Sequence, residues 1–247
     1  MKRIFIVTSL LFNALLFGTQ ISVIGEVFTQ TWWGYCPDAR AGLSQLADNH
    51  TNVIPLIWEG DGHNSPGYSQ RGSMYGVGGI PHVEFNGHVD VVGGGTNMYP
   101  YYADVYSDLI DDDSPVYIDL VAYLNQDDGG LDIVADIVMT GDITTSDNKV
   151  VFFLTYKFSS EYFCTVVGYE YVDFELYGEG ETGLYTHHFD VDPTWNMAVL
   201  NAIVLVQSYS SSSKEIYNGA TTNLWQDPTM DMTLAYSGDW VTVGLPM

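Results

Sequence analysis

One succession of segments constrains the fold more than any other: an apolar strand, an aromatic loop and the start of a helix, between residues 21 and 49. Residues 21–28 are apolar and rich in β-branched side chains, which is typical of a buried strand. The loop follows at 29–37, and Pro37 suits the first turn of a helix, where its missing N–H costs nothing. Proteins of the α/β class place binding and reactive groups at such junctions, because free N–H groups at a helix N-terminus favour an anion or a thiolate. The apolar face of the predicted helix consists of Ala39, Leu43, Leu46 and Ala47.

Strands and helices continue to alternate as far as residue 110. Asn86-Gly87 is the strongest signal for a two-residue hairpin turn and separates the last two of these strands. The predicted strands are 21–28, 53–58, 77–85 and 88–92, and the predicted helices are 37–49, 68–75 and 97–110.

The pattern changes at residues 111–115, an acidic and turn-rich segment. Beyond it, apolar and polar residues alternate over short runs separated by polar turns, which favours an antiparallel sandwich. The sequence therefore predicts an α/β domain over residues 20–110 and an all-β antiparallel sandwich domain over 111–247. The strands predicted for the second domain are 116–124, 131–139, 150–158, 162–177, 184–191 and 197–209.

The first residues have the composition of a secretory signal. Lys2 and Arg3 precede an apolar run at 4–17 that is shorter than the ~20 residues a membrane-spanning helix needs. We predict that residues 1–19 form a signal peptide and that the protein is exported. Its location would be the periplasm, the outer membrane surface or the extracellular medium, with no transmembrane span after cleavage.

Charge and cysteine content exclude several classes of function. The chain has 31 acidic and 7 basic residues, a formal net charge of −24, so nucleic acid and anionic membrane surfaces would be repelled. Two cysteines, Cys36 and Cys164, are too few for a disulfide framework. No hydrolase or nucleotide-binding motif is present.

Two motifs in the first domain resemble those of the thioredoxin family. Thr31-Trp32-Trp33-Gly34-Tyr35-Cys36-Pro37 resembles T-W-C-G-x-C-P, with Trp33 in place of the first cysteine. Tyr75-Gly76-Val77-Gly78-Gly79-Ile80-Pro81 resembles the Y-G-V-x-G-x-P segment, which in that family carries a cis-proline facing the active site. The resemblance covers about residues 20–110 and implies a thioredoxin-like fold there. A looser resemblance, to the twenty-eight-kilodalton outer-membrane protein family, implies a secreted protein with a C-terminal β-domain.

This resemblance also implies where the site lies and what it lacks. Disulfide exchange needs an attacking thiolate and a resolving thiol, and Trp33 occupies the attacking position. We therefore predict a non-catalytic, binding or structural protein of the cell envelope, with a protein or peptide as ligand. The predicted binding groove is formed by Trp32, Trp33, Tyr35, Ile80 and Pro81.

Several alternatives stay open at this point. The protein could be a thiol–disulfide oxidoreductase that acts through Cys36 alone, or Cys36 and Cys164 could form a bridge. We predict no metal and no cofactor: His82 and His88 flank the hairpin but lack further zinc ligands, so surface histidines are expected. Acidic turns could hold calcium, as in a calcium-stabilised adhesin, although none matches an EF-hand loop. The oligomeric state is not predicted.

Overall fold

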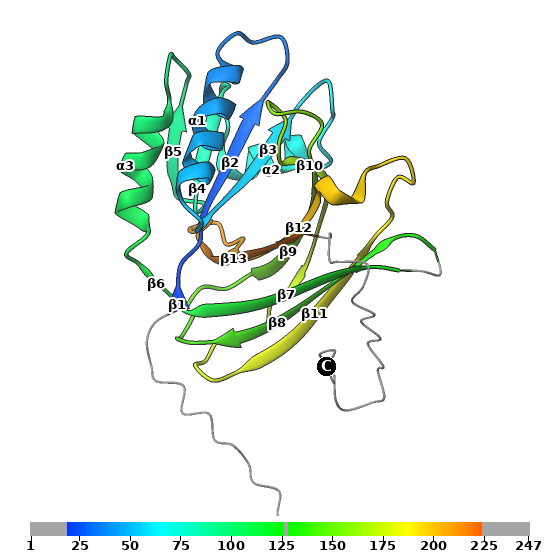
Figure 1. Ribbon diagram of the computed structural model, residues 1–247. Coiled ribbons are helices and arrows are strands. Elements are labelled where there is room, and N and C mark those ends of the chain that lie inside the picture. The colour runs from blue at the N-terminus through cyan, green and yellow to red at the C-terminus, as the bar shows by residue number, and fades with distance from the viewer. Residues whose placement is uncertain (1–18, 126–127, 224–247) are drawn as a thin grey trace, which may run out of the picture.

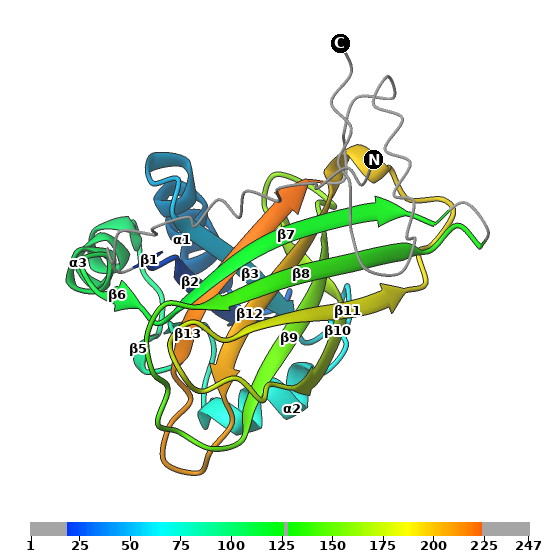
Figure 2. The same cartoon turned by 90° about the horizontal axis from the view of Figure 1, so that it is seen from below.

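The structure is a computed structural model that describes residues 19–125 and 128–223 (Figures 1 and 2). The predicted signal peptide lies outside the described residues, except for Thr19. No helix in the described part is long and apolar enough to cross a membrane.

The first half of the chain follows the predicted order of strands and helices. Strand β2 is central in it, parallel to β3 and antiparallel to β4, and β5 forms one edge of the sheet. The turn predicted at Asn86-Gly87 is present, with positive φ angles of 45° and 73°. The elements are β2 (Val23–Thr29), α1 (Cys36–Asn49), β3 (Val53–Glu59), α2 (Tyr68–Tyr75), β4 (His82–Phe85), β5 (Val89–Val92) and α3 (Tyr99–Leu109).

The second half supplies strands to two sheets. β9, β10, β12 and β13 join the strands of the first half in one eight-stranded sheet of order β13-β12-β9-β10-β3-β2-β4-β5. β7, β8 and β11 form a separate antiparallel sheet of order β11-β8-β7, and a two-residue pairing joins β1 (Thr19–Gln20) to β6 (Asp113–Ser114). The bounds are β7 (Val116–Leu124), β8 (Leu131–Met139), β9 (Asn148–Tyr156), β10 (Thr165–Asp173), β11 (Thr182–Phe189), β12 (Leu200–Ser208) and β13 (Ile216–Asn223), with a 3₁₀ turn at Met197–Val199.

The predicted fold class is wrong. The described chain, with 43% strand and 18% helix, does not form a thioredoxin-like α/β domain followed by an all-β sandwich. Strand β10 lies parallel to β3, with Thr165 opposite Ile57, and the Ile57 N–H donates to the Cys164 carbonyl at 2.9 Å. Alternation of apolar residues indicates that a strand exists but not which edge it joins, and here the free edge of β3 is joined by a strand from the second half.

Three layers of apolar side chains result from this arrangement. Helices α1 and α3 cover one face of β2, β3 and β4, and β7, β8 and β11 cover one face of β9 and β12. Between these layers lies a shared core, to which β2 and β3 contribute Ile24 and Trp58 and β9 and β12 contribute Phe153 and Leu205. Gly219 of β13 packs closely against this shared core, because a Cβ there would lie 2.7 Å from Ile24 Cδ1.

A buried ion pair lies within the shared core. Arg71 of α2 donates from Nη2 and Nε to the Glu26 carboxylate of β2, at 2.6 and 2.8 Å, and both side chains are fully buried. The second half of the chain completes the network, because Arg71 Nη1 donates to the Tyr209 hydroxyl at 2.9 Å and Gln207 donates to Tyr75 at 2.8 Å. The two halves therefore share polar as well as apolar contacts.

Candidate functional site

Three aromatic side chains project from the loop between β2 and α1. Trp32, Trp33 and Tyr35 are 67%, 39% and 53% exposed, respectively. Their rings meet edge to face, with centroids 5.5 Å apart for the two tryptophans and 6.1 Å apart for Trp33 and Tyr35. We call these residues the aromatic triad. Exposed aromatic clusters of this kind are typical of interaction surfaces.

The remaining groove residues predicted from the sequence lie at the start of β4. The Ile80–Pro81 bond is cis, as predicted. Pro81 is buried near Tyr35, and Gly94 lets the chain pass close to both, because a Cβ there would lie 2.6 Å from the Tyr35 carbonyl and 3.1 Å from Pro81. Ile80 packs partly against the shared core. The structure thus places Pro81 near Tyr35, whereas the role of the predicted groove residues in binding stays a prediction.

Cys36 begins helix α1 and points into the core. Its side chain is fully buried, and its N–H donates to the Trp33 carbonyl at 3.0 Å. Burial raises the pKa of the Cys36 thiol, against the lowering effects of the Gln30 N–H and the Arg40 charge. Cys164 is also free, and burial raises its pKa to about 12. The bridge considered between the two cysteines is absent, and protonated thiols are poor nucleophiles.

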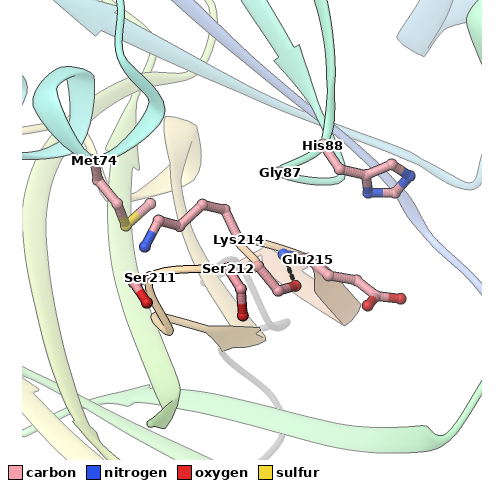
Figure 3. A pocket seen from close by; sticks show the side chains of 8 residues that line it. Met74, Gly87, His88, Ser211, Ser212, Lys214 and Glu215 are labelled. Atoms are coloured by element: carbon pink, nitrogen blue, oxygen red, sulfur yellow. Dashed lines mark hydrogen bonds between the residues drawn. The ribbon is translucent and has the colours of Figure 1, made fainter. Parts of the chain in front are cut away.

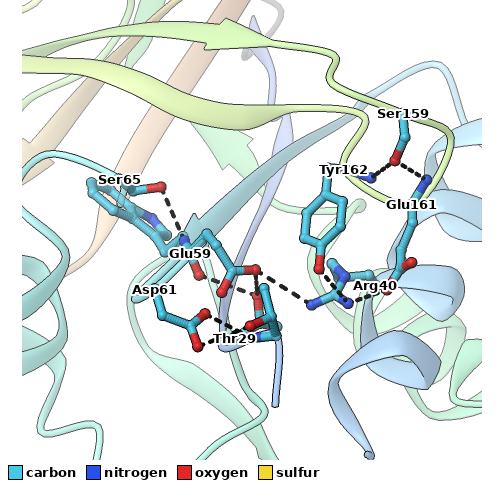
Figure 4. A network of polar contacts seen from close by, with 10 residues as sticks. Thr29, Arg40, Glu59, Asp61, Ser65, Ser159, Glu161 and Tyr162 are labelled. Atoms are coloured by element: carbon cyan, nitrogen blue, oxygen red, sulfur yellow. Dashed lines mark hydrogen bonds and ion pairs between the residues drawn. The ribbon is translucent and has the colours of Figure 1, made fainter. Parts of the chain in front are cut away.

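A buried polar network lies beneath the aromatic loop (Figure 4). Thr29 and Glu59 end the parallel strands β2 and β3, and the Thr29 hydroxyl donates to Glu59 Oε2 at 3.3 Å. Arg40 of α1 lies 3.6 Å from the same oxygen, with both partners buried. Carboxyl ends of adjacent parallel strands meet at one edge of a sheet, which is where α/β proteins bind ligands. No pattern in the sequence indicates this network, because only the folded sheet brings its members together.

The loop between β9 and β10 covers the network from the second half of the chain. Glu161 forms an ion pair with Arg40, and the Tyr162 ring lies 4.5 Å from the Arg40 guanidinium. Phe158 of the same loop stacks on His63 of the β3–α2 loop, with ring centroids 3.9 Å apart. The site is therefore built from both halves of the chain.

Asp61 connects the network to the aromatic loop. Its carboxylate accepts two hydrogen bonds from Thr31, from the backbone N–H at 2.7 Å and from the hydroxyl at 3.0 Å. Burial, and then hydrogen bonding with Asp61, raises the pKa of Glu59 to about 7, although the Arg40 charge lowers it. Glu59 is thus a carboxyl group that changes charge near neutral pH.

Comparison with known proteins shows the fold and no family. No protein-family model matches the chain, and no curated protein sequence does. The structure is similar to HBP35 of Porphyromonas gingivalis, with a TM-score of 0.63 and 15% identity, covering 90% of this chain and 81% of that one. The two proteins share a fold.

A second comparison is weaker. A domain of the outer membrane lipoprotein Omp28 from Porphyromonas gingivalis aligns with a TM-score of 0.32 and 13% identity, covering 45% of this chain and 88% of that one. This TM-score is too low to show a shared fold. The thioredoxin-like fold implied by the two motifs is not confirmed by these comparisons.

A hollow lies at the C-terminal end of β4, near the hairpin turn, whereas Pro81 lies at the N-terminal end of this strand. It has a volume of about 550 Å³ and is lined by Met74, Gly87, His88 and residues 211–215 (Figure 3). The Lys214 ammonium donates to the carbonyls of Tyr209 and Ser210, so its charge is directed to the chain itself. None of the residues predicted to form the binding groove lines this hollow.

The histidines differ in part from the expectation of surface positions. His82 is buried, with Nε2 3.1 Å from Glu84, whereas His88 is exposed. Among the described residues, no group of three or more His, Cys, Asp or Glu side chains could hold a metal ion. Calcium binding by the acidic turns stays a prediction.

Proposed function

We propose that this chain is an exported protein of the cell envelope that binds an extended polypeptide at the aromatic triad and does not catalyse disulfide exchange. The observation that carries the proposal is the exposure of Trp32, Trp33 and Tyr35 together on one loop, fixed from below by a buried network. The apolar run at 4–17 supports export. A relationship to the twenty-eight-kilodalton outer-membrane protein family rests on the sequence motifs alone.

The surroundings of the triad favour a basic partner. A hollow of about 560 Å³ runs along α1, the helix that follows the triad, and includes Asp38, Asp48 and Glu161 in its lining. The charge of Arg40 in the same lining is buried and paired, so the accessible charge is negative. Lysine and arginine side chains also bind favourably over indole and phenol rings. We therefore infer that the ligand is a peptide segment with basic and apolar side chains, which the net charge of −24 would attract.

Alanine at Trp32 should weaken peptide binding by about tenfold or more, as removal of a central aromatic anchor does at other interfaces. The measurement is binding of the purified protein to an array of short synthetic peptides of random sequence, with Trp32→Ala and Tyr35→Ala beside the wild type. Tyr117→Ala is the matched control, because Tyr117 is 48% exposed but lies on β7 of the other sheet. Equal binding by all four proteins, or no preference for basic peptides, would contradict the proposal.

The absence of exchange activity has its own test. We expect no reduction of insulin disulfides by the native protein, because the only thiol at the loop is buried and protonated. Trp33→Cys should introduce an accessible thiol at the helix N-terminus, where the helix dipole lowers a thiol pKa, and give slow exchange. Trp33→Ser serves as the control and should stay inactive. Activity of the unmodified protein that disappears in Cys36→Ser would instead establish a single-thiol enzyme.

A further inference from the structure

The aromatic triad is held in place through a carboxylate. Thr31, directly before Trp32, donates both its N–H and its hydroxyl to Asp61, at 2.7 and 3.0 Å. Asp61 itself follows the end of β3 by two residues, so these hydrogen bonds connect the aromatic loop to a buried strand. Asp61 is therefore bonded to the residue that directly precedes the triad.

Glu59 is the group beside Asp61 whose pairing is incomplete. Its Oε1 accepts no hydrogen bond within the described residues, and Nε and Nη1 of Arg40 donate none. Arg40 also divides its charge between Glu59 and Glu161. An ionised Glu59 would thus stand in a buried place, next to a second carboxylate, with part of one cation to balance it.

The groups packed around Glu59 come from every neighbouring element. Helix α1 contributes a thiol and a guanidinium, β2 a hydroxyl, α2 a phenol, and the β9–β10 loop a second phenol and a carboxylate. By residue these are Cys36, Arg40, Thr29, Tyr68, Tyr162 and Glu161, together with Asp61 and His63 of the loop after β3. His63 is the other group in this set with an ordinary pKa near neutrality, and burial lowers its pKa.

We propose that a proton on Glu59 holds the aromatic triad in its binding position, and that loss of this proton releases the aromatic loop. With the proton present, Glu59 donates to Asp61 and leaves that carboxylate bound to Thr31. When the proton passes to solvent, two adjacent carboxylates repel each other and the tie to Thr31 weakens. The pKa of Glu59, about 7, places this change near neutral pH. This regulation rests on the proposed binding function of the triad.

The test follows the triad directly by ¹⁹F NMR of the protein labelled with 5-fluorotryptophan. Single Trp→Phe variants assign the Trp32 and Trp33 signals. We expect both signals to titrate with a midpoint near pH 7 in the wild type and to be constant over that range in Glu59→Gln. His63→Asn and Glu161→Gln are controls, and both should still titrate. A titration that persists in Glu59→Gln, or that vanishes in His63→Asn, would overturn the proposal.

A second variant covers the case in which Glu59→Gln does not fold. Asp61→Asn removes the second carboxylate, so the Glu59 proton should be lost more easily and the midpoint should move down by about one pH unit or more. An unchanged midpoint in Asp61→Asn would also overturn the proposal.

Binding of a lysine-rich peptide from the array separates the two proposals. We expect wild-type affinity to fall about fivefold or more between about pH 6 and pH 8.5, and Glu59→Gln to keep the affinity of the acidic form. Binding that needs Trp32 but is the same at both pH values would refute the switch and leave the binding function standing. A ¹⁹F transition without any peptide binding would refute the binding function and leave the proton-controlled loop.

Discussion

Replacement of Arg71 by methionine is expected to destabilise the protein by about 3–5 kcal/mol, because it leaves the fully buried Glu26 carboxylate without its cation. Methionine fills much of the volume of the arginine side chain, so the cost is that of an uncompensated charge rather than of a cavity. The measurement is the free energy of unfolding at neutral pH from guanidinium denaturation. The double variant Arg71→Met, Glu26→Gln should recover a large part of the loss, because no charge is then left unpaired.

A surface ion pair provides the control for this prediction. Lys149 lies 2.7 Å from Asp147 and 2.5 Å from Asp173, and both carboxylates are well exposed. Lys149→Met should therefore cost less than about 1 kcal/mol. A comparable cost for Arg71→Met and Lys149→Met would show that burial of the Glu26–Arg71 pair has no energetic consequence.

The same denaturation curves test the predicted division at residues 111–115. Arg71 is bound by Glu26 from the first half of the chain and by Tyr209 from the second. We expect far-ultraviolet circular dichroism and tryptophan fluorescence to report one coincident transition, shifted as a whole by Arg71→Met. Two separated transitions would instead support independent units at 20–110 and 111–247.

The second large effect is a dependence of stability on pH caused by Glu59. Its pKa is about 7 in the folded protein and 4.5 as the ordinary value, so the folded state binds the proton more tightly than the unfolded state. The resulting stabilisation is fully present below about pH 4.5 and is lost as the pH rises through 7. Its size is about 3 kcal/mol, since one pKa unit corresponds to about 1.4 kcal/mol.

Subtracting the Glu59→Gln curve isolates this contribution from all other titrating groups. The difference between the free energies of unfolding of the wild type and Glu59→Gln should change by that amount between acidic pH and about pH 8, in favour of the variant at high pH. His63→Asn should leave the Glu59 contribution in place and remove only a contribution of opposite sign, because burial lowers the pKa of His63. If the free energies of unfolding of the wild type and Glu59→Gln instead change in parallel with pH, ionisation of Glu59 does not destabilise the folded protein, and the prediction is wrong.

Local patterns predicted the elements of the first half because helices, hairpin turns and buried strands are encoded by neighbouring residues. The pairing of β10 with β3 could not be predicted in this way, since the contact between Thr165 and Ile57 depends on how the whole sheet curves. The same distinction applies to the site. The loop motif predicted the residues of the triad, whereas Arg40 and its partner Glu161 are 121 positions apart in the chain.

The position of β13 in the shared core has a consequence for when the protein can fold. Gly219 packs against Ile24, and the Ile216 N–H donates to the carbonyl of Asn86 at the hairpin turn. The last described strand, β13, is therefore needed to complete the contacts of strands from the start of the chain. Contacts this distant along the chain form slowly, because loop closure must precede them. A chain emerging from the ribosome cannot complete this core until β13 has been synthesised. In the exported protein proposed above, late closure leaves the polypeptide without a complete core for longer, which suits passage through a secretion channel before folding.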